Sequence, residues 1–167
     1  VYHQFGQWSD ILKISREFGV MADVVINHGS SESLWFKNFI KGEGKGSDYF
    51  LNFDEPFDTS KVVRPRTSDL LNPVETSDGM KYIWCTFSKD QVDYNFSNPV
   101  VLFEFVQIII FYLTKGITVF RLDAVAFIWK KIGTSCINLE KTHEIVRLFR
   151  TLLTYLSPKA ILVTETN

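Results

Sequence analysis

Three short apolar segments that alternate with helical patterns constrain the fold of this chain most strongly. Each is rich in aliphatic or β-branched residues and has the length of a buried strand; the three cover residues 20–26, 117–123 and 160–165. Apolar residues at helical spacing precede each of them, within residues 8–18, 98–115 and 139–155. This alternation favours right-handed βαβ units on a parallel sheet, as in (β/α)8 barrels and doubly wound folds.

The second helix has explicit boundary signals. Asn98 is a good N-cap residue, Pro99 suits the first helical position, and Gly116 ends the pattern. The first strand contains a single charged residue, Asp23, in a segment that we expect to be buried on both faces of the sheet.

The number of strands is too small for a complete barrel. A (β/α)8 barrel needs eight strands and typically about 250 residues, whereas this chain has 167 residues and three such segments. If the sheet belongs to a barrel, we therefore expect an α/β fold that forms only part of a TIM barrel. The hydrophobic content of 46% is enough for a sizeable core and argues against disorder.

Charge and composition exclude several partners. The formal net charge of −1 favours no nucleic acid partner. The longest apolar run, residues 108–113, is far shorter than the ~20 residues of a membrane-spanning helix, so no membrane insertion is expected. Two isolated cysteines, Cys85 and Cys136, are typical of free thiols in a cytoplasmic protein.

Residues 29–97 lack regular periodicity and are rich in Gly, Ser, Asp, Pro and aromatic residues. The segment is too long for an ordinary loop, so we expect a small subdomain whose aromatic residues form a core of their own. This divides the chain into a barrel segment at 1–28, the subdomain at 29–97, and βα units at 98–167. The run GEGKG at 42–46 lacks the context of a phosphate loop and is interpreted as a surface turn.

Each predicted strand ends in polar residues: Asn27 and His28, then Arg121 and Asp123, then Thr164 and Glu165. In a parallel barrel these ends meet at one mouth, where active sites lie.

Arg121 and Asp123 are two residues apart and share a strand face, so the guanidinium is expected to keep the carboxylate ionised. With Glu165 on the neighbouring strand, Asp123 suits the carboxylate pair of a retaining glycosidase, about 5–5.5 Å apart. The alternative is a structural Arg121–Asp123 ion pair with a solvated Glu165.

Three segments resemble, in order, the first three signature regions of the α-amylase clan: DVVINH at 23–28, FRLDAV at 120–125 and VTE at 163–165. Further segments resemble the sucrose phosphorylase subgroup, especially its glucosylglycerate phosphorylase-like members. They are RPRTS at 64–68, WCTFSKDQVD at 84–93, WKKIGTSC at 129–136, KTH at 141–143 and TETN at 164–167. The resemblance covers essentially the whole chain and implies barrel strands three to five, with a subdomain inserted after the third.

The resemblance also implies roles for individual residues. Asp123 is the expected nucleophile, Arg121 its orienting partner and Glu165 the general acid/base. His28 is expected to bind the glucosyl unit, and Asp23 to position Arg121.

Three further residues are weaker candidates for the acceptor side. Arg64 or Arg66 is expected to meet phosphate, for which a guanidinium is well suited, although a structural or solvated arginine is an equal alternative. Gln91 is a candidate for the acceptor pocket, with a loop-stabilising hydrogen bond as its alternative.

The implied activity is retaining transfer of a glucosyl unit from a sucrose-like or glucosylglycerate-like α-glucoside to inorganic phosphate, with no organic cofactor and no metal. The alternatives are a hydrolase or transglucosidase of the same clan, and a non-catalytic remnant. The third catalytic carboxylate of the clan is expected beyond Asn167, so we expect the isolated chain to be nearly inactive. The oligomeric state stays open.

Overall fold

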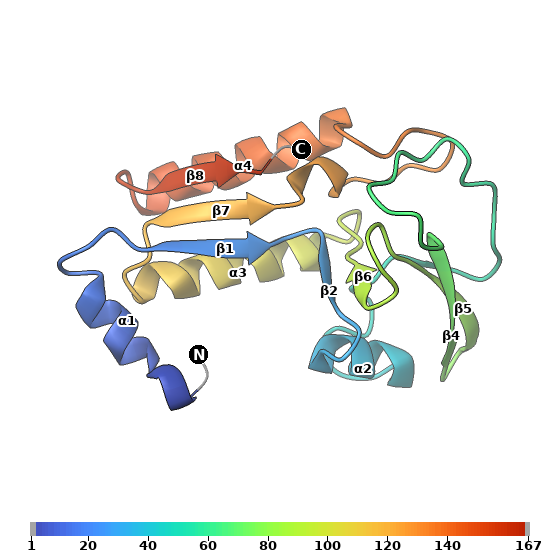
Figure 1. The fold of residues 1–167 in the computed structure, drawn as a ribbon, viewed down its shortest axis with the longest axis horizontal. Helices are drawn as coiled ribbons and strands as arrows, with labels where there is room; N and C mark the ends of the chain where they lie inside the picture. The colour runs from blue at the N-terminus through green and yellow to red at the C-terminus, as the bar shows by residue number, and fades with distance from the viewer. Residues whose placement is uncertain (1–2, 166–167) are drawn as a thin grey trace.

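The computed structural model describes residues 3–165 and contains one parallel sheet, a group of short antiparallel strands and several helices (Figure 1). The elements in chain order are η1 (His3–Phe5), α1 (Trp8–Ile14), β1 (Met21–Val25), β2 (His28–Ser30), α2 (Leu34–Lys41), β3 (Asn52–Phe53), β4 (Leu71–Thr76), β5 (Gly79–Trp84), β6 (Gln91–Asp93), α3 (Pro99–Thr114), β7 (Val119–Asp123), η2 (Val125–Phe127), α4 (Glu140–Leu156) and β8 (Ile161–Thr164).

The three predicted apolar strands form one parallel sheet in the order β1-β7-β8. In its register Asp23 pairs with Arg121, and Val25 with Asp123. Leu122 pairs with Thr164 on the other side. All three strands end at the same edge (Figure 1), which confirms the parallel arrangement expected from the sequence.

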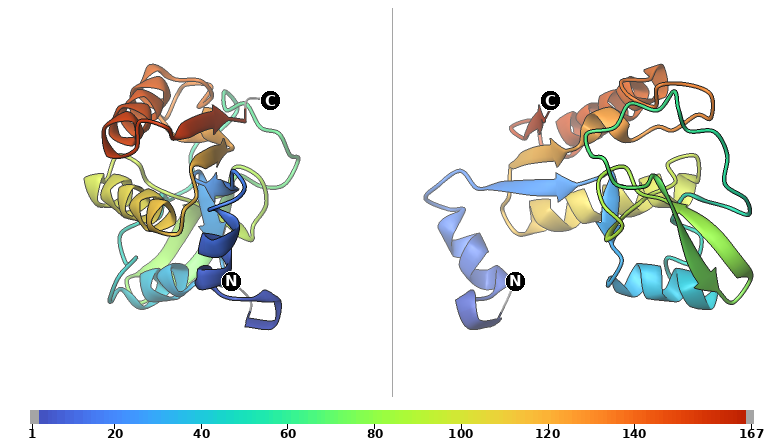
Figure 2. Two further views of the ribbon diagram at one scale, coloured as in Figure 1. Left: turned by 90° about the vertical axis from the view of Figure 1, so that its left-hand side faces the viewer. Right: turned by 45° about the vertical axis from the view of Figure 1, so that its right-hand side comes forward.

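Both long helices cover the same side of this sheet, as the end-on view in Figure 2 shows. Val24, Phe120 and Leu122 point into the resulting core and are almost fully buried. Alternate residues such as Met21 and Val25 are exposed. The expectation that the first strand is buried on both faces was therefore wrong for the described residues, because helices α3 and α4 cover one face only.

The boundaries of α3 match their sequence signals. The Asn98 side chain accepts a hydrogen bond from the Val100 amide at 3.0 Å, and Pro99 is the first helical residue. Gly116 adopts a left-handed φ of 79° just beyond the helix. Helix α1 is shorter than predicted, because it ends at Ile14 and turns lead to Gly19.

Residues 29–97 contain regular structure of their own. Strands β4 and β5 form an antiparallel hairpin joined by β3, and β2 pairs with β6. Most of the aromatic residues expected to form a separate core do not do so, which corrects that prediction: Trp35, Phe36, Tyr49 and Phe50 belong to the same cluster as the sheet core. The Tyr94 ring lies 5.2 Å from Phe50 and also 5.2 Å from Phe105 of α3, so the apolar cluster runs across the expected domain boundary.

A smaller apolar cluster lies beside the hairpin. Trp84 and Leu70 pack with Cys136, which comes from the loop between β7 and α4. Both cysteines are free thiols, as predicted, and both are buried. Among residues 3–165, no helix is long and apolar enough to cross a membrane.

Gly116 offers a test of the packing between α1 and the end of α3. A Cβ at this position would overlap the Ser15 side chain, with Ser15 Cβ only 2.7 Å away. At Gly79, which also has a left-handed φ of 90°, an added Cβ meets nothing within 4 Å.

We predict that Gly79→Ala lowers the free energy of unfolding by about 1–2 kcal/mol through its backbone conformation. Gly116→Ala should cost roughly 1–3 kcal/mol more, because overpacking adds to the same backbone penalty. Urea unfolding of both variants measures the difference. Equal losses would contradict the close packing of Gly116 against Ser15.

Candidate active site

Four charged side chains project from the exposed face of the parallel sheet near its carboxyl edge. Asp23, Arg121 and Asp123 occupy alternate positions of β1 and β7, so they share one face. The amide of Glu165 donates to the carbonyl of Leu122 at 3.0 Å, which continues the β7–β8 pairing past the end of β8. The backbone therefore places Glu165 beside Asp123.

Arg121 is held by two carboxylates. Its Nε donates to Asp23 Oδ1 at 2.6 Å and its Nη2 to Asp23 Oδ2 at 2.9 Å, a bidentate pair. Its Nη1 lies 3.8 Å from Glu165 Oε2. The pKa of Arg121 is raised, first by the hydrogen bonds that it donates to Asp23 and then by the charges of Asp23, Glu165 and Asp123.

The structure thus places Asp23 against Arg121, where the resemblance to the α-amylase clan put it. The Arg121–Asp123 ion pair considered as an alternative is not formed, because the guanidinium binds the Asp23 carboxylate instead. Within residues 3–165, the Asp123 carboxylate makes no hydrogen bond or ion pair. Ala124, immediately after it, has a left-handed φ of 54° that turns the chain sharply into η2. The Asp123 side chain is left half-buried at the strand end.

His28 lies at the start of β2, just beyond β1, and its side chain is buried. Its Nε2 is 2.8 Å from Gln91 Nε2, and its ring centroid is 5.2 Å from that of Phe87. Burial lowers the pKa of His28, although the charges of Asp93 and Asp123 oppose the shift. The imidazole is therefore mainly neutral at neutral pH.

The side-chain amide of Gln91 contacts the imidazole of His28. Its oxygen also accepts a hydrogen bond from the Ser88 hydroxyl at 3.0 Å. Its contacts include the loop-stabilising bond that was the alternative to a substrate role.

A buried polar network lies behind His28. The Lys130 ammonium is 2.8 Å from Asp93 Oδ2 and donates to Asn27 Oδ1 at 2.7 Å. Asp93 also accepts hydrogen bonds from Asn27 Nδ2 and from the amide and hydroxyl of Thr86. Burial lowers the pKa of Lys130, and the charge of Asp93 opposes this shift. The network ties four segments of the chain together at the strand ends.

Sequence reasoning gave Lys130 no role. Lys130 directly follows the apolar pair Ile128 and Trp129, and Asp93 lies between Val92 and Tyr94. Lys131 follows at once and is exposed, so the local sequence does not single out Lys130 as the buried lysine.

The two candidate arginines are separated from the carboxylates in sequence and differ in exposure. Arg66 is exposed, whereas Arg64 is half-buried. The Nη2 of Arg64 is 3.5 Å from Ser68 Oγ, and its Nε is buried without a hydrogen-bond partner among the described residues.

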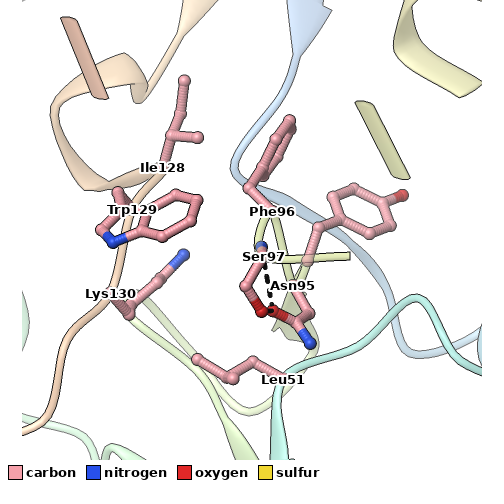
Figure 3. Close-up of a pocket in the computed structure, with 8 residues that line it drawn as sticks. Leu51, Asn95, Phe96, Ser97, Ile128, Trp129 and Lys130 are labelled. Atoms are coloured by element: carbon pink, nitrogen blue, oxygen red, sulfur yellow. Dashed lines mark hydrogen bonds between the residues drawn. The ribbon is translucent and has the colours of Figure 1, made fainter. Parts of the chain in front are cut away.

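Two hollows in the described part of the chain lie away from the carboxylate cluster. The cavity in Figure 3 lies beside Lys130, Trp129 and Asn95 and has a volume of about 50 Å³. A second cavity, of about 380 Å³, lies between α3 and α4 and includes Leu102 and Ile145. The first is far below the roughly 300 Å³ or more of a small-ligand pocket. The carboxylates of Asp23 and Glu165 instead lie on the solvent-accessible face of the sheet, where their side chains are 47% and 36% exposed.

The carboxyl edge of the parallel sheet offers three kinds of reactive group: carboxylates, one guanidinium and one imidazole. Among the described residues, no group of three or more His, Cys, Asp or Glu side chains is arranged to hold a metal ion.

Comparison with known proteins decides the family. The model of the family Alpha-amylase, described as "Alpha amylase, catalytic domain", matches residues 1–167. The chain belongs to the alpha-amylase family. Its α/β fold, with the parallel sheet β1-β7-β8, is similar to that of the TIM-barrel enzymes in this family.

Several similar proteins in the alpha-amylase family are phosphorylases. The chain is 45% identical over 164 residues to glucosylglycerate phosphorylase of Allomeiothermus silvanus, covering 98% of this chain and 30% of that protein. It is 43% identical over 171 residues to glucosylglycerate phosphorylase of Escherichia coli, and the match covers 99% of this chain and 31% of that protein.

A solved structure shows the same fold. The sucrose 6F-phosphate phosphorylase of Thermoanaerobacter thermosaccharolyticum superposes with a TM-score of 0.88 and 26% identity, covering 99% of this chain and 37% of that one. The chain thus spans about a third of the length of these family members.

Proposed function

We propose that this chain carries the nucleophile and the acid/base of a retaining α-glucosyl phosphorylase. The enzyme would transfer glucose from a glucosylglycerate-like or sucrose-like donor to inorganic phosphate and release glucose 1-phosphate. Support comes from the names of the relatives, which include glucosylglycerate phosphorylases at 42–45% identity and a sucrose phosphorylase at 29%.

The observation that carries the proposal is the position of two carboxylates on neighbouring parallel strand ends. The hydrogen bond from the Glu165 amide to the Leu122 carbonyl sets Glu165 beside Asp123. Both side chains are half-buried on the open face. Retaining glycosyl transfer uses two carboxyl groups, about 5–5.5 Å apart, that flank the scissile glycosidic bond.

In the first step, an oxygen of Asp123 attacks the anomeric carbon of the donor while the glycosidic bond breaks. Glu165, in its acid form, gives its proton to the departing oxygen. A covalent glucosyl ester of Asp123 and a free alcohol, glycerate or fructose, result.

In the second step, a phosphate oxygen attacks the same carbon from the opposite side, and the ester bond to Asp123 breaks. Glu165 takes up the proton of the attacking phosphate where that oxygen carries one. Two inversions give net retention and the α-anomer of glucose 1-phosphate. Each step uses side chains and phosphate alone, so we propose no organic cofactor and no metal.

Arg121 and His28 complete the donor side of the proposed site. The bidentate pair with Asp23 fixes the guanidinium on the same strand face as Asp123, two residues before it. His28 lies beyond the end of β1, and the charge of Asp123 acts on it. We propose that its ring hydrogen-bonds the glucosyl unit.

Phosphate recognition is assigned to Arg66. Its side chain is exposed, and a guanidinium fits two phosphate oxygens at once. Arg64 is less accessible, because its Nε is buried. Gln91 contacts His28 and is proposed to border the acceptor side.

The same proposal covers the architecture. The strands β1, β7 and β8 would be barrel strands three to five, and residues 29–97 would be a subdomain inserted after the third strand. The exposed face with Met21, Val25 and Ile161 would then face the barrel interior.

We predict that the full-length protein releases glucose 1-phosphate from glucosylglycerate or sucrose only when phosphate is present. Asp123→Asn should lower kcat by about 10⁴-fold or more, because the amide cannot form the ester. A coupled assay for glucose 1-phosphate measures this, with Asp90→Asn, an exposed aspartate, as the matched control.

Other outcomes identify other functions. Free glucose released at the same rate with and without phosphate would assign the protein to the hydrolases. Glucosyl transfer to a sugar hydroxyl would indicate a transglucosidase. No turnover of either donor would favour a non-catalytic protein.

We predict that Arg66→Ala raises the KM for phosphate by about 10-fold to 100-fold, the equivalent of one or two charge-assisted hydrogen bonds. The KM for the glucoside should change little. The KM for phosphate of Arg66→Lys should lie between that of the unaltered protein and that of Arg66→Ala. Lysine keeps the positive charge but loses the bidentate hydrogen bonding of the guanidinium. Arg147→Ala, on the exposed side of α4, is the control. An unchanged phosphate KM in Arg66→Ala would remove Arg66 from the site.

A further inference from the structure

The buried pair of Lys130 and Asp93 calls for an explanation beyond stability. Its two side chains are only 5% and 0% exposed, and their charged atoms are 2.8 Å apart. Removing two ions from water costs several kcal/mol for each, and apolar replacements of such pairs are often neutral or stabilising. A pair of this kind is more readily explained by the geometry that it imposes on its neighbours.

The neighbour on which the pair acts most directly is Asn27. Its Oδ1 accepts from the Lys130 ammonium at 2.7 Å, and its Nδ2 donates to Asp93 Oδ2 at 3.0 Å. An ammonium can only donate and a carboxylate can only accept. The two charges therefore allow the Asn27 amide a single orientation, with its NH2 group fixed.

That NH2 group lies 3.5 Å from Nδ1 of His28. An N–H group facing Nδ1 disfavours a proton on this nitrogen, so the neutral ring carries its proton on Nε2. The nearest partner of Nε2 is the side-chain amide of Gln91, at 2.8 Å. Because an amide can turn to present its oxygen, and the Ser88 hydroxyl can either donate or accept, Gln91 can accept from Nε2–H.

We propose that the Lys130–Asp93 pair is a positioning device for His28: by fixing the Asn27 amide, it holds the imidazole in the tautomer with its proton on Nε2. The inference rests on the proposed function for its catalytic meaning, since that function places His28 beside the glucosyl unit. The backbone supports it, because His28 and Asp93 are directly paired between β2 and β6. Burial also lowers the pKa of His28 and favours the neutral ring.

The test is ¹⁵N NMR of histidine-labelled full-length protein, with the His28 signals assigned by their loss in His28→Gln. Two variants break the device at different points. Asn27→Ala keeps the Lys130–Asp93 ion pair and removes the side-chain amide that connects this pair to His28. Lys130→Met combined with Asp93→Asn removes both charges together, so neither is left buried and unpaired. Lys131→Met, the exposed neighbour, is the matched control.

In the unaltered protein and in Lys131→Met, Nδ1 should give a pyridine-type signal and Nε2 a pyrrole-type signal. Both test variants should show mixed tautomers or a proton on Nδ1. Their kcat/KM for the glucoside should fall by about 10-fold, the equivalent of one misdirected hydrogen bond. The control should keep its activity.

A proton on Nδ1 in the unaltered protein would overturn the inference, as would an unaltered His28 pattern in both test variants. The NMR measurement needs no substrate. Absence of phosphorolysis in the unaltered protein would therefore refute the proposed function, while the tautomer result alone would still decide the role of the ion pair.

Discussion

The parallel register of β1, β7 and β8 is the constraint on which the rest of the arrangement depends. Side chains alternate between the two faces of a strand, so one register decides at once which residues enter the core and which form the site. Val24, Phe120 and Leu122 lie under α3 and α4, whereas Asp23, Arg121 and Asp123 share the opposite face. A slip by one residue would bury the charges and expose the core.

The strand ends alone do not form the site, because residues far apart in the sequence must be held against them. The ion pair of Lys130 with Asp93 joins the loop after η2 to β6, and Asn27 and Thr86 extend the same network to the ends of β1 and β5. Tyr94 and Phe96 add apolar contact with Phe105 of α3. The 29–97 segment is therefore anchored to the sheet both by a polar network and by the shared core.

Much of the fold and part of the candidate site could be predicted from the sequence. The three strands, the helix that begins at Pro99 and the shared face of Arg121 and Asp123 follow from patterns of neighbouring residues. The partner of Arg121 did not follow from local spacing, because the choice of Asp23 over Asp123 depends on the register between β1 and β7. Lys130 was missed because its partners lie 37 residues or more away in the sequence. The continuous aromatic core was missed for the same reason, since ring contacts such as Tyr94 with Phe105 depend on tertiary packing.

We propose that Asp123 forms a covalent bond to the glucosyl unit at the carboxyl edge of the parallel sheet. The most direct measurement is to incubate the full-length protein with a fluorinated glucosyl fluoride that slows the second step, and to map the adduct by peptide mass spectrometry. We predict one glucosyl adduct, on the peptide that contains Asp123, and none in Asp123→Asn. An adduct on another residue, or phosphorolysis that inverts the anomeric configuration, would contradict it.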